Sequence, residues 1–143
     1  MRATSFLASL LLAASSGPAH ASDYVAMSGK DLYGRFCASC HGVAGRGDGP
    51  VAGSLKVEVP DLTLVARRAQ GRYPRDRIEK IIDGRFILAA HGTRTMPVWG
   101  EDFSRFELGN PDAERSTRLI IQRLADYVWL LQQPSREATE EQQ

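Results

Sequence analysis

The sequence predicts a single all-α domain. Its 143 residues suffice for one hydrophobic core and are too few for two comfortable ones. Three segments carry apolar residues at helical spacing, and no segment shows the alternation that is typical of a strand. We therefore expect a small fold made of helices joined by loops.

The first residues predict an export signal. Arg2 precedes an apolar run over 6–14, and Ala19-His20-Ala21 forms a small-x-small cleavage site. The run is about half of the roughly 20 apolar residues that a membrane-spanning helix needs. We expect cleavage after Ala21.

This interpretation divides the chain into a signal peptide over residues 1–21, a folded domain over 22–134 and a polar tail over 135–143. We expect the domain in the periplasm, where cofactors can be attached outside the cytoplasm, and without a membrane span after cleavage. The formal net charge of +1 falls to about zero when the signal is lost, which argues against nucleic-acid binding.

The charge is distributed unevenly along the chain. Residues 67–85 contain seven basic and three acidic side chains, whereas residues 101–114 contain five acidic and one basic. Such a distribution has two interpretations. It can form a dipolar surface that steers a charged partner, or it can be an ordinary solvated face of mixed charge.

The first predicted helix begins at Ser28. Ser28 suits an N-cap, Asp31 places an acid in the first turn, and Leu32 and Phe36 fall on one face. The helix leads directly into the only two cysteines. Five glycines and a proline within 42–53 then predict a loop whose backbone turns closely around something.

A second helix is predicted after Pro74, which suits a first turn. Ile78, Ile81 and Ile82 repeat at helical spacing, and Gly84 supplies a left-handed stop. This helix is expected to face a core.

The last predicted helix is the longest amphipathic segment. The Asn-Pro-Asp sequence at 110–112 is a start signal, and Pro134 ends the helix. Its apolar positions are Ile120, Leu124, Val128 and Leu131.

The sequence CASCH at 37–41 places Cys37, Cys40 and His41 together, and three of its interpretations are weak. A thioredoxin-type dithiol would need a strand-to-helix turn of a parallel sheet. A zinc site would need a fourth ligand from His91 or an acid and lacks the usual second ligand pair. A disulfide would close a very small loop and leave the histidine without a role.

A fourth interpretation uses every residue of the motif. Two thiols three positions apart can add to the two vinyl groups of a haem, and His41 is then held under the iron as its ligand. The expected cofactor is one haem c, bound covalently through Cys37 and Cys40. The export signal and the helical pattern favour the same conclusion.

From about residue 29 to residue 131, the sequence resembles the bacterial, exported, monohaem class I c-type cytochromes. That family has an N-terminal helix that ends in the cysteine motif, a glycine-rich loop with Gly-Pro, a distal Met-Pro, and a C-terminal helix that crosses the first. The resemblance implies a small helical cytochrome c fold wrapped around one haem. It also implies that Gly29 and Phe36 contact Leu124 and Tyr127.

The resemblance further implies a role for Pro50. In the family a loop proline carbonyl accepts the Nδ1 hydrogen of the iron-binding histidine, and Gly49-Pro50 matches that loop. The hydrogen bond would fix the tautomer of His41 and make it a more basic ligand.

The sixth iron position has few candidates. Met96 precedes Pro97, which confines it to extended backbone, whereas Met27 lies close to the other side of the ring in sequence. We expect Met96 as the second metal ligand beside His41, with a bis-histidine site through His91 as the alternative and core packing as the ordinary role of a methionine.

Trp99 is the remaining cofactor-binding candidate: it can stand at a haem edge or donate its indole hydrogen to a propionate, and plain packing explains it equally well. An apolar wall is expected around the ring, and it would raise the reduction potential. Its candidates are Val59, Leu62, Leu64, Ile81, Ile82 and Leu88.

A closed iron site predicts an electron carrier and no enzyme. The protein would serve redox partner proteins such as a dehydrogenase, oxidase or reductase, either as a diffusible carrier or as the haem subunit of an oxidoreductase complex, without a small-molecule substrate. The alternatives are a haem-based gas binder or sensor whose Met96 dissociates, and a haem-free thiol or zinc protein.

Overall fold

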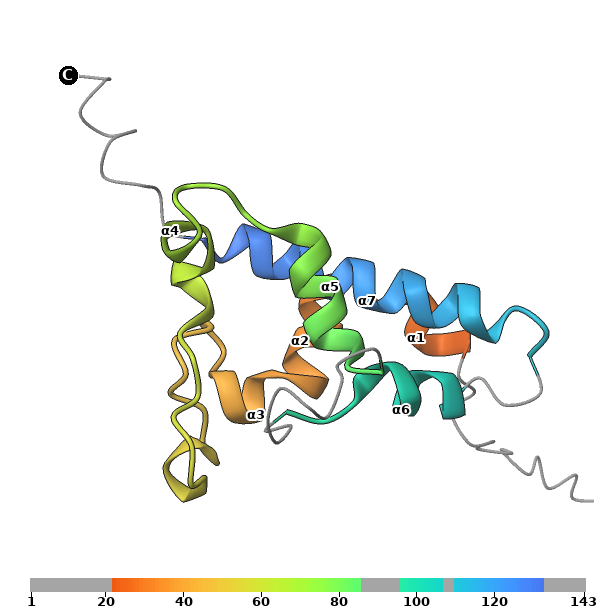
Figure 1. The fold of residues 1–143 in the computed structure, drawn as a ribbon. Helices are drawn as coiled ribbons and strands as arrows, with labels where there is room; N and C mark the ends of the chain where they lie inside the picture. Colours follow the sequence, from red (N-terminus) through yellow and green to blue (C-terminus); the bar gives the residue numbers. More distant parts are fainter. Residues whose placement is uncertain (1–21, 86–95, 107–109, 133–143) are drawn as a thin grey trace, which may run out of the picture.

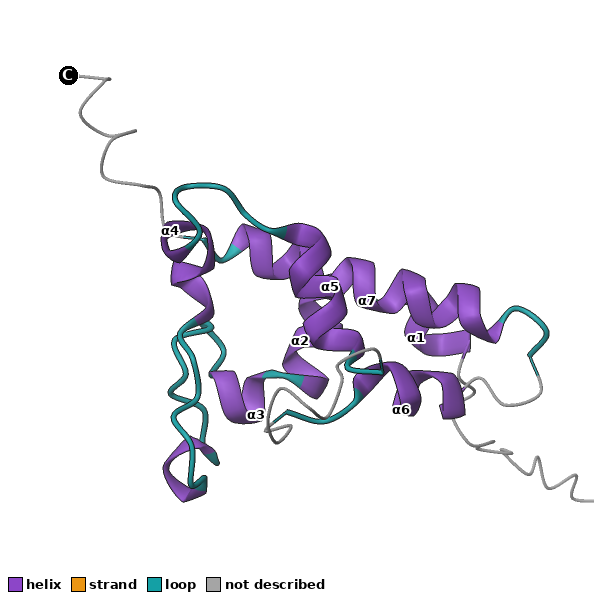
Figure 2. Ribbon diagram, in the orientation of Figure 1, coloured by secondary structure: helices purple, strands orange, loops and turns teal. Residues whose placement is uncertain are grey.

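The structure is a computed structural model that describes residues 22–85, 96–106 and 110–132 (Figure 1). Across these residues the chain forms helices and loops and no strand, which confirms the all-α prediction (Figure 2). The helices are α1 Ser22–Ala26, α2 Gly29–Phe36, α3 Ala38–His41, α4 Val65–Arg68, α5 Arg75–Asp83, α6 Trp99–Phe106 and α7 Ala113–Leu130, with 3₁₀ turns η1 Ala52–Ser54 and η2 Leu62–Leu64.

Helix α7 is the centre of the packing. Helices α1, α2, α5 and α6 all contact it. Its start lies at Ala113, directly after the predicted Asn-Pro-Asp signal, and its inner face repeats at helical spacing. The fully buried or nearly buried apolar side chains of that face are Ile120, Ile121, Leu124, Ala125 and Val128.

Helix α2 crosses α7 at a glycine. Ser28 caps α2 as predicted, because its side chain accepts a hydrogen bond from the Asp31 amide at 3.2 Å. At Gly29 an added Cβ would overlap the carbonyl oxygen of Arg123 and stand 3.1 Å from Cβ of Tyr127. The close approach of these two helices was expected, and a side chain at Gly29 would force them apart.

Helix α5 has the predicted bounds. It begins after Pro74 and ends at Gly84, whose φ of 69° lies in the left-handed region that favours glycine. Ile82 is buried in the core. Val98, two residues beyond Met96, packs directly against Gly84.

Helix α6 was not predicted. Phe103 is its fully buried residue, and its ring lies 5.8 Å from that of Trp99 and 5.1 Å from that of Phe36, measured between centroids. This aromatic cluster fixes α6 against the end of α2. Its aromatic residues Trp99, Phe103 and Phe106 do recur at helical spacing, and this was the signal that could have predicted the helix.

In the described part of the chain, no helix has the length and apolar character needed to cross a membrane. The predicted signal peptide and polar tail, at 1–21 and 135–143, lie outside the described residues.

Candidate functional site

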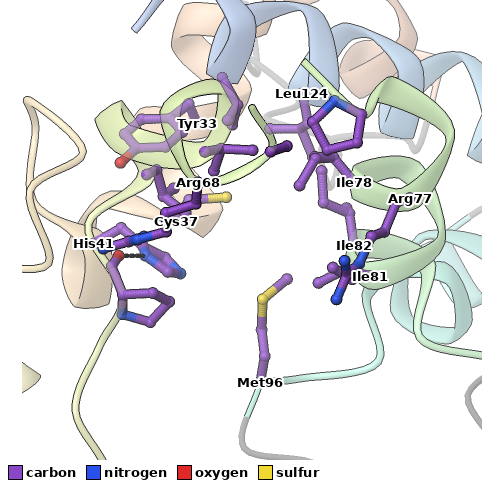
Figure 3. Close-up of a pocket in the computed structure, with 16 residues that line it drawn as sticks. Tyr33, Cys37, His41, Arg68, Arg77, Ile78, Ile81, Ile82, Met96 and Leu124 are labelled. Carbon is purple, nitrogen blue, oxygen red and sulfur yellow. Dashed lines mark hydrogen bonds between the residues drawn. The ribbon is translucent and has the colours of Figure 1, made fainter. Parts of the chain in front are cut away.

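A mostly apolar pocket of about 420 Å³ opens between α3 and α5, with α7 behind it (Figure 3). This volume is in the range of small-molecule and cofactor sites. Its lining comes from α2, α3, η2, α4, α5 and α7, from neighbouring loop residues and from Met96. The lining residues are Tyr33, Cys37, His41, Pro60, Leu62, Val65, Arg68, Ala69, Pro74, Arg77, Ile78, Ile81, Ile82, Met96, Leu124 and Val128.

The motif at 37–41 presents two of its functional side chains to this pocket. The backbone amide of His41 donates to the carbonyl of Cys37 at 2.9 Å, so these residues are separated by one helical turn. Residues four apart lie on one face of a helix, and both Cys37 and His41 line the pocket. Cys40 is half-buried beside them, and both thiols are free.

His41 has a fixed orientation. Its Nδ1 lies 3.2 Å from the carbonyl oxygen of Pro60. A carbonyl can only accept, so Nδ1 carries the proton and Nε2 of the neutral ring keeps a free lone pair. Burial lowers the pKa of His41, and the bond to Pro60 partly offsets this effect, so the ring is neutral at neutral pH and suited to bind a metal.

The expectation that Pro50 accepts this hydrogen bond is wrong. Gly49 and Val51 donate their amides to the carbonyls of Cys40 and Ser39, each at 3.1 Å, which places this turn against the backbone of α3. Pro50 itself is exposed. The proline with the predicted role is the one ten residues later.

The glycine loop brings Pro60 to the imidazole. Gly47 has a φ of 80° and lies against the backbone of Val59, where a Cβ would overlap the carbonyl oxygen. Leu62 then donates its amide to the Gly45 carbonyl at 2.7 Å. The loop therefore folds back on itself next to α3, and Pro60 lies on the returning half.

Gln132 ties this returning segment to the end of α7. Its Oε1 accepts the amide of Ala66 at 2.8 Å, and its Nε2 donates to the carbonyl of Leu62 at 2.9 Å. Both bonds join residues more than sixty positions apart in sequence. The segment that follows Pro60 is thus held by the glycine loop and by α7 together.

Cys37 is a half-buried thiol in the pocket wall. Burial, and to a lesser degree the neighbouring Cys40, raises the pKa of Cys37 to about 12. This thiol is therefore protonated at neutral pH, unlike the exposed thiolate of a dithiol oxidoreductase. Among the described residues, no group of three or more His, Cys, Asp and Glu side chains is placed to hold a metal ion by itself.

Met96 reaches the pocket from the opposite side. Figure 3 shows its thioether directed into the open space between His41 and the isoleucines of α5. An imidazole nitrogen and a thioether sulfur on opposite sides of an apolar pocket, with a thiol in the wall, form the donor set that suits a haem in cytochromes c. The residues present therefore fit this cofactor.

The other predicted site residues are placed less directly. Trp99 is not among the residues that line the pocket, and its ring packs on Phe36 and Phe103. This is the packing role foreseen for it, and a contact with the cofactor stays a prediction. His91 lies outside the described residues.

The apolar wall differs in part from the prediction. Leu62, Ile81 and Ile82 line the pocket, whereas Val59 and Leu64 do not, and Leu88 lies outside the described residues. The sequence analysis did not name several residues of the wall. Three of them had a signal: Ile78 shares helical spacing with Ile81 and Ile82, and Leu124 and Val128 lie on the apolar face of the last predicted helix. The missed residues are Tyr33, Val65, Ile78, Leu124 and Val128.

Comparison with protein families identifies the chain. Residues 25–110, more than half of the sequence, match the family described as cytochrome c oxidase, cbb3-type, subunit III. A search of curated proteins and a search of solved structures gave no significant match. The family match, the all-α fold and the pocket beside the cysteine motif agree with one another. The chain therefore belongs to this family of monohaem c-type cytochromes, whose haem serves electron transfer.

Proposed function

We propose that this protein carries single electrons in the periplasm on one haem c, held covalently through Cys37 and Cys40 and coordinated by His41 and Met96. The observation that carries this proposal is the pocket itself. It has a neutral, oriented imidazole on one side, a thioether on the other, and Cys37 in its wall. Periplasmic location is supported by the signal-like sequence over residues 1–21.

Each side chain has a defined task in this proposal. A bound haem supplies an iron that accepts and releases one electron. Cys37 and Cys40 hold the ring by thioether bonds in which each S–H adds across one vinyl group. The protonated Nδ1 of His41 stays on the Pro60 carbonyl and aims Nε2 at the metal.

The pocket walls favour electron transfer over substrate chemistry. If His41 and Met96 both held the iron, no open coordination position would remain for a substrate. The isoleucines of α5 and Leu124 and Val128 of α7 keep the surroundings apolar. Low polarity disfavours the extra charge of ferric iron and so raises the reduction potential.

The partner in this proposal is an oxidase complex, because the matching family is described as an oxidase subunit. Arg68 and Arg77 line the pocket and are exposed to solvent. They belong to the basic stretch over residues 67–85. Cations at the pocket mouth favour a partner whose docking face is acidic, and they would speed its association at low ionic strength.

A haem assay on the exported protein tests the proposal. An alkaline-pyridine spectrum together with haem staining on a denaturing gel should show one covalently bound haem. Cys37→Ala and Cys40→Ala should each weaken or abolish the stained band, because each removes one thioether bond. Ser39→Ala, between them and exposed, is the matched control and should stain like the parent.

A colourless exported protein in which both thiols react with an alkylating reagent would overturn the proposal. So would a haem that is lost from the parent protein on denaturation, since covalent attachment is the central claim.

A further inference from the structure

Arg85 lies where the chain leaves α5, eleven residues before Met96. Its guanidinium donates two hydrogen bonds of similar length to the Asp83 carboxylate, from Nε to Oδ1 at 2.7 Å and from Nη2 to Oδ2 at 2.8 Å. The backbone amide of Arg85 adds a third, at 3.2 Å to Oδ1. The side chains of Asp83 and Arg85 are only 13% and 23% exposed, so solvent screens this pair weakly.

The same guanidinium reaches α7. Its Nη1 donates to Oε2 of Glu114 at 2.8 Å and its Nη2 to Oε1 at 3.1 Å. These bonds hold the carboxylates ionised, and they lower the pKa of Asp83 and that of Glu114. Asp83, Arg85 and Glu114 therefore form one network, which we call the Arg85 clamp.

The returning chain packs on this clamp. A Cβ added to Gly100, in the first turn of α6, would overlap both Oδ1 of Asp83 and Nε of Arg85. Val98 packs against Gly84, and its carbonyl accepts the amides that begin α6, from Glu101 at 3.0 Å and Asp102 at 3.2 Å. The residues just after Met96 are thus in contact with the residues at the end of α5.

We propose that Arg85 is a positioning residue for Met96: the Arg85 clamp holds the start of α6 against the end of α5 and so fixes the backbone of the nearby Met96, which keeps the thioether over the pocket. This inference rests on the proposed function, because it concerns the ligand role of Met96.

Bringing the start of α6 next to the end of α5 costs conformational entropy, because it closes a loop of the chain. Contacts between the two must offset this cost. Pro97 restricts the backbone conformation of Met96, but it cannot set where Met96 lies relative to α5. Two contacts set that position. Val98 packs on Gly84, and Gly100 packs on Asp83 and Arg85, two and four residues after Met96.

Binding of carbon monoxide to the reduced holoprotein tests the clamp. We expect Arg85→Ala to keep its covalent haem and to bind carbon monoxide with an equilibrium constant at least about tenfold above that of the parent, equivalent to about 1.4 kcal/mol. The charge-transfer absorption of the iron–sulfur bond should weaken in parallel, and the reduction potential should fall. Glu114→Gln keeps the Asp83 pair and should give a smaller change in the same direction.

Arg105→Ala is the matched control. Arg105 also makes an ion pair, with Glu101 at 2.5 Å, but both side chains are more than half exposed and lie on the outer face of α6. Its removal should leave carbon monoxide binding, absorption and potential unchanged. Arg85→Lys keeps the charge without the two-pronged geometry and should fall between the parent and Arg85→Ala.

The outcomes separate this inference from the proposed function. If Met96→Ala opens the iron but folded, haem-loaded Arg85→Ala and Glu114→Gln both behave like the parent, the clamp does not position Met96. If Met96→Ala itself behaves like the parent, the ligand assignment fails first. Should Arg85→Ala not fold, Glu114→Gln decides alone, and parent-like carbon monoxide binding in it would overturn the inference.

Discussion

Met96 and His41 approach the pocket from backbones with little freedom. His41 closes a helical turn with Cys37, and its ring is hydrogen-bonded to Pro60. Met96 is followed by Pro97 and by the contact between Val98 and Gly84. In the proposed function, two ligands with restricted backbones would keep their positions when the charge of the metal changes, which favours rapid electron transfer.

Replacement of Met96 by alanine tests the ligand assignment. We expect Met96→Ala to keep its covalent haem, to bind carbon monoxide when reduced, and to lose a sizeable part of the roughly 0.8 V range over which axial ligands set haem potentials. Absorption spectra, ligand titration and potentiometry measure these three properties.

His91→Ala is the control for this experiment. If His91→Ala loses the parent's spectrum and potential while Met96→Ala retains them, the iron has two histidine ligands. Rapid binding of carbon monoxide by the parent protein itself would instead favour a gas binder or sensor whose distal ligand dissociates.

At the residue scale, donor type and spacing singled out side chains that the structure brings together. Cys37, His41 and Met96 all line one pocket, and their roles toward the cofactor stay a prediction. The prediction for Pro50 was wrong because Pro50 and Pro60 both follow the motif closely. Only the folded path of the glycine loop decides which carbonyl lies beside His41. Pro60 reaches His41 since Leu62 pairs with Gly45, a contact that no local pattern encodes.

At the scale of elements, the crossing of α2 and α7 shapes the wall of the pocket. Tyr33 of α2 and Leu124 of α7 are both fully or almost fully buried, and both line the pocket. The Tyr33 hydroxyl donates to the carbonyl of Gly42 at 2.8 Å, which links α2 to the start of the glycine loop. A change in the crossing would therefore displace two sides of the pocket at once.

Two glycines of α2 provide a matched test of this crossing. Gly29→Ala should lower the free energy of unfolding by about 1–3 kcal/mol, because its Cβ would press on the Arg123 carbonyl. Gly34→Ala meets no atom within 4 Å and should raise that free energy by up to about 1 kcal/mol through helix propensity. Denaturant unfolding of both holoproteins measures the difference. Equal effects at the two positions would contradict close packing at Gly29.

The helices that could be predicted from the sequence are those with clear start or stop signals. Helices α2, α5 and α7 have apolar periodicity together with a serine cap, a left-handed glycine or an Asn-Pro-Asp start, and all three were predicted. Helix α6 and the short helices α1 and α4 depend on tertiary contacts for their stability. The aromatic cluster around Phe103 is such a contact, and only the folded chain reveals it.

At the scale of the whole molecule, the pocket is part of the core. Leu124, Val128 and Ile82 belong both to the buried apolar cluster and to the pocket lining. A small domain buries a smaller fraction of its surface on folding than a larger one does. An apolar cavity of about 420 Å³ within that core deprives its lining of contacts unless a large flat ligand fills it.

We therefore expect the haem-free polypeptide to be largely unfolded. Cys37→Ala/Cys40→Ala, produced without haem, should show low helical content by circular dichroism and no cooperative thermal transition. The parent holoprotein is the reference and should melt cooperatively. A haem-free chain that melts near the temperature of the holoprotein would show that the polypeptide core is sufficient without the cofactor.

The two amide bonds of Gln132 have a consequence for the order of events in the life of the chain. Until Gln132 has docked, these two bonds to Ala66 and Leu62 are absent, and the stretch that follows Pro60 lacks this restraint from the end of α7. The backbone that presents the Pro60 carbonyl to His41 is therefore fully held only once the C-terminal helix is in place.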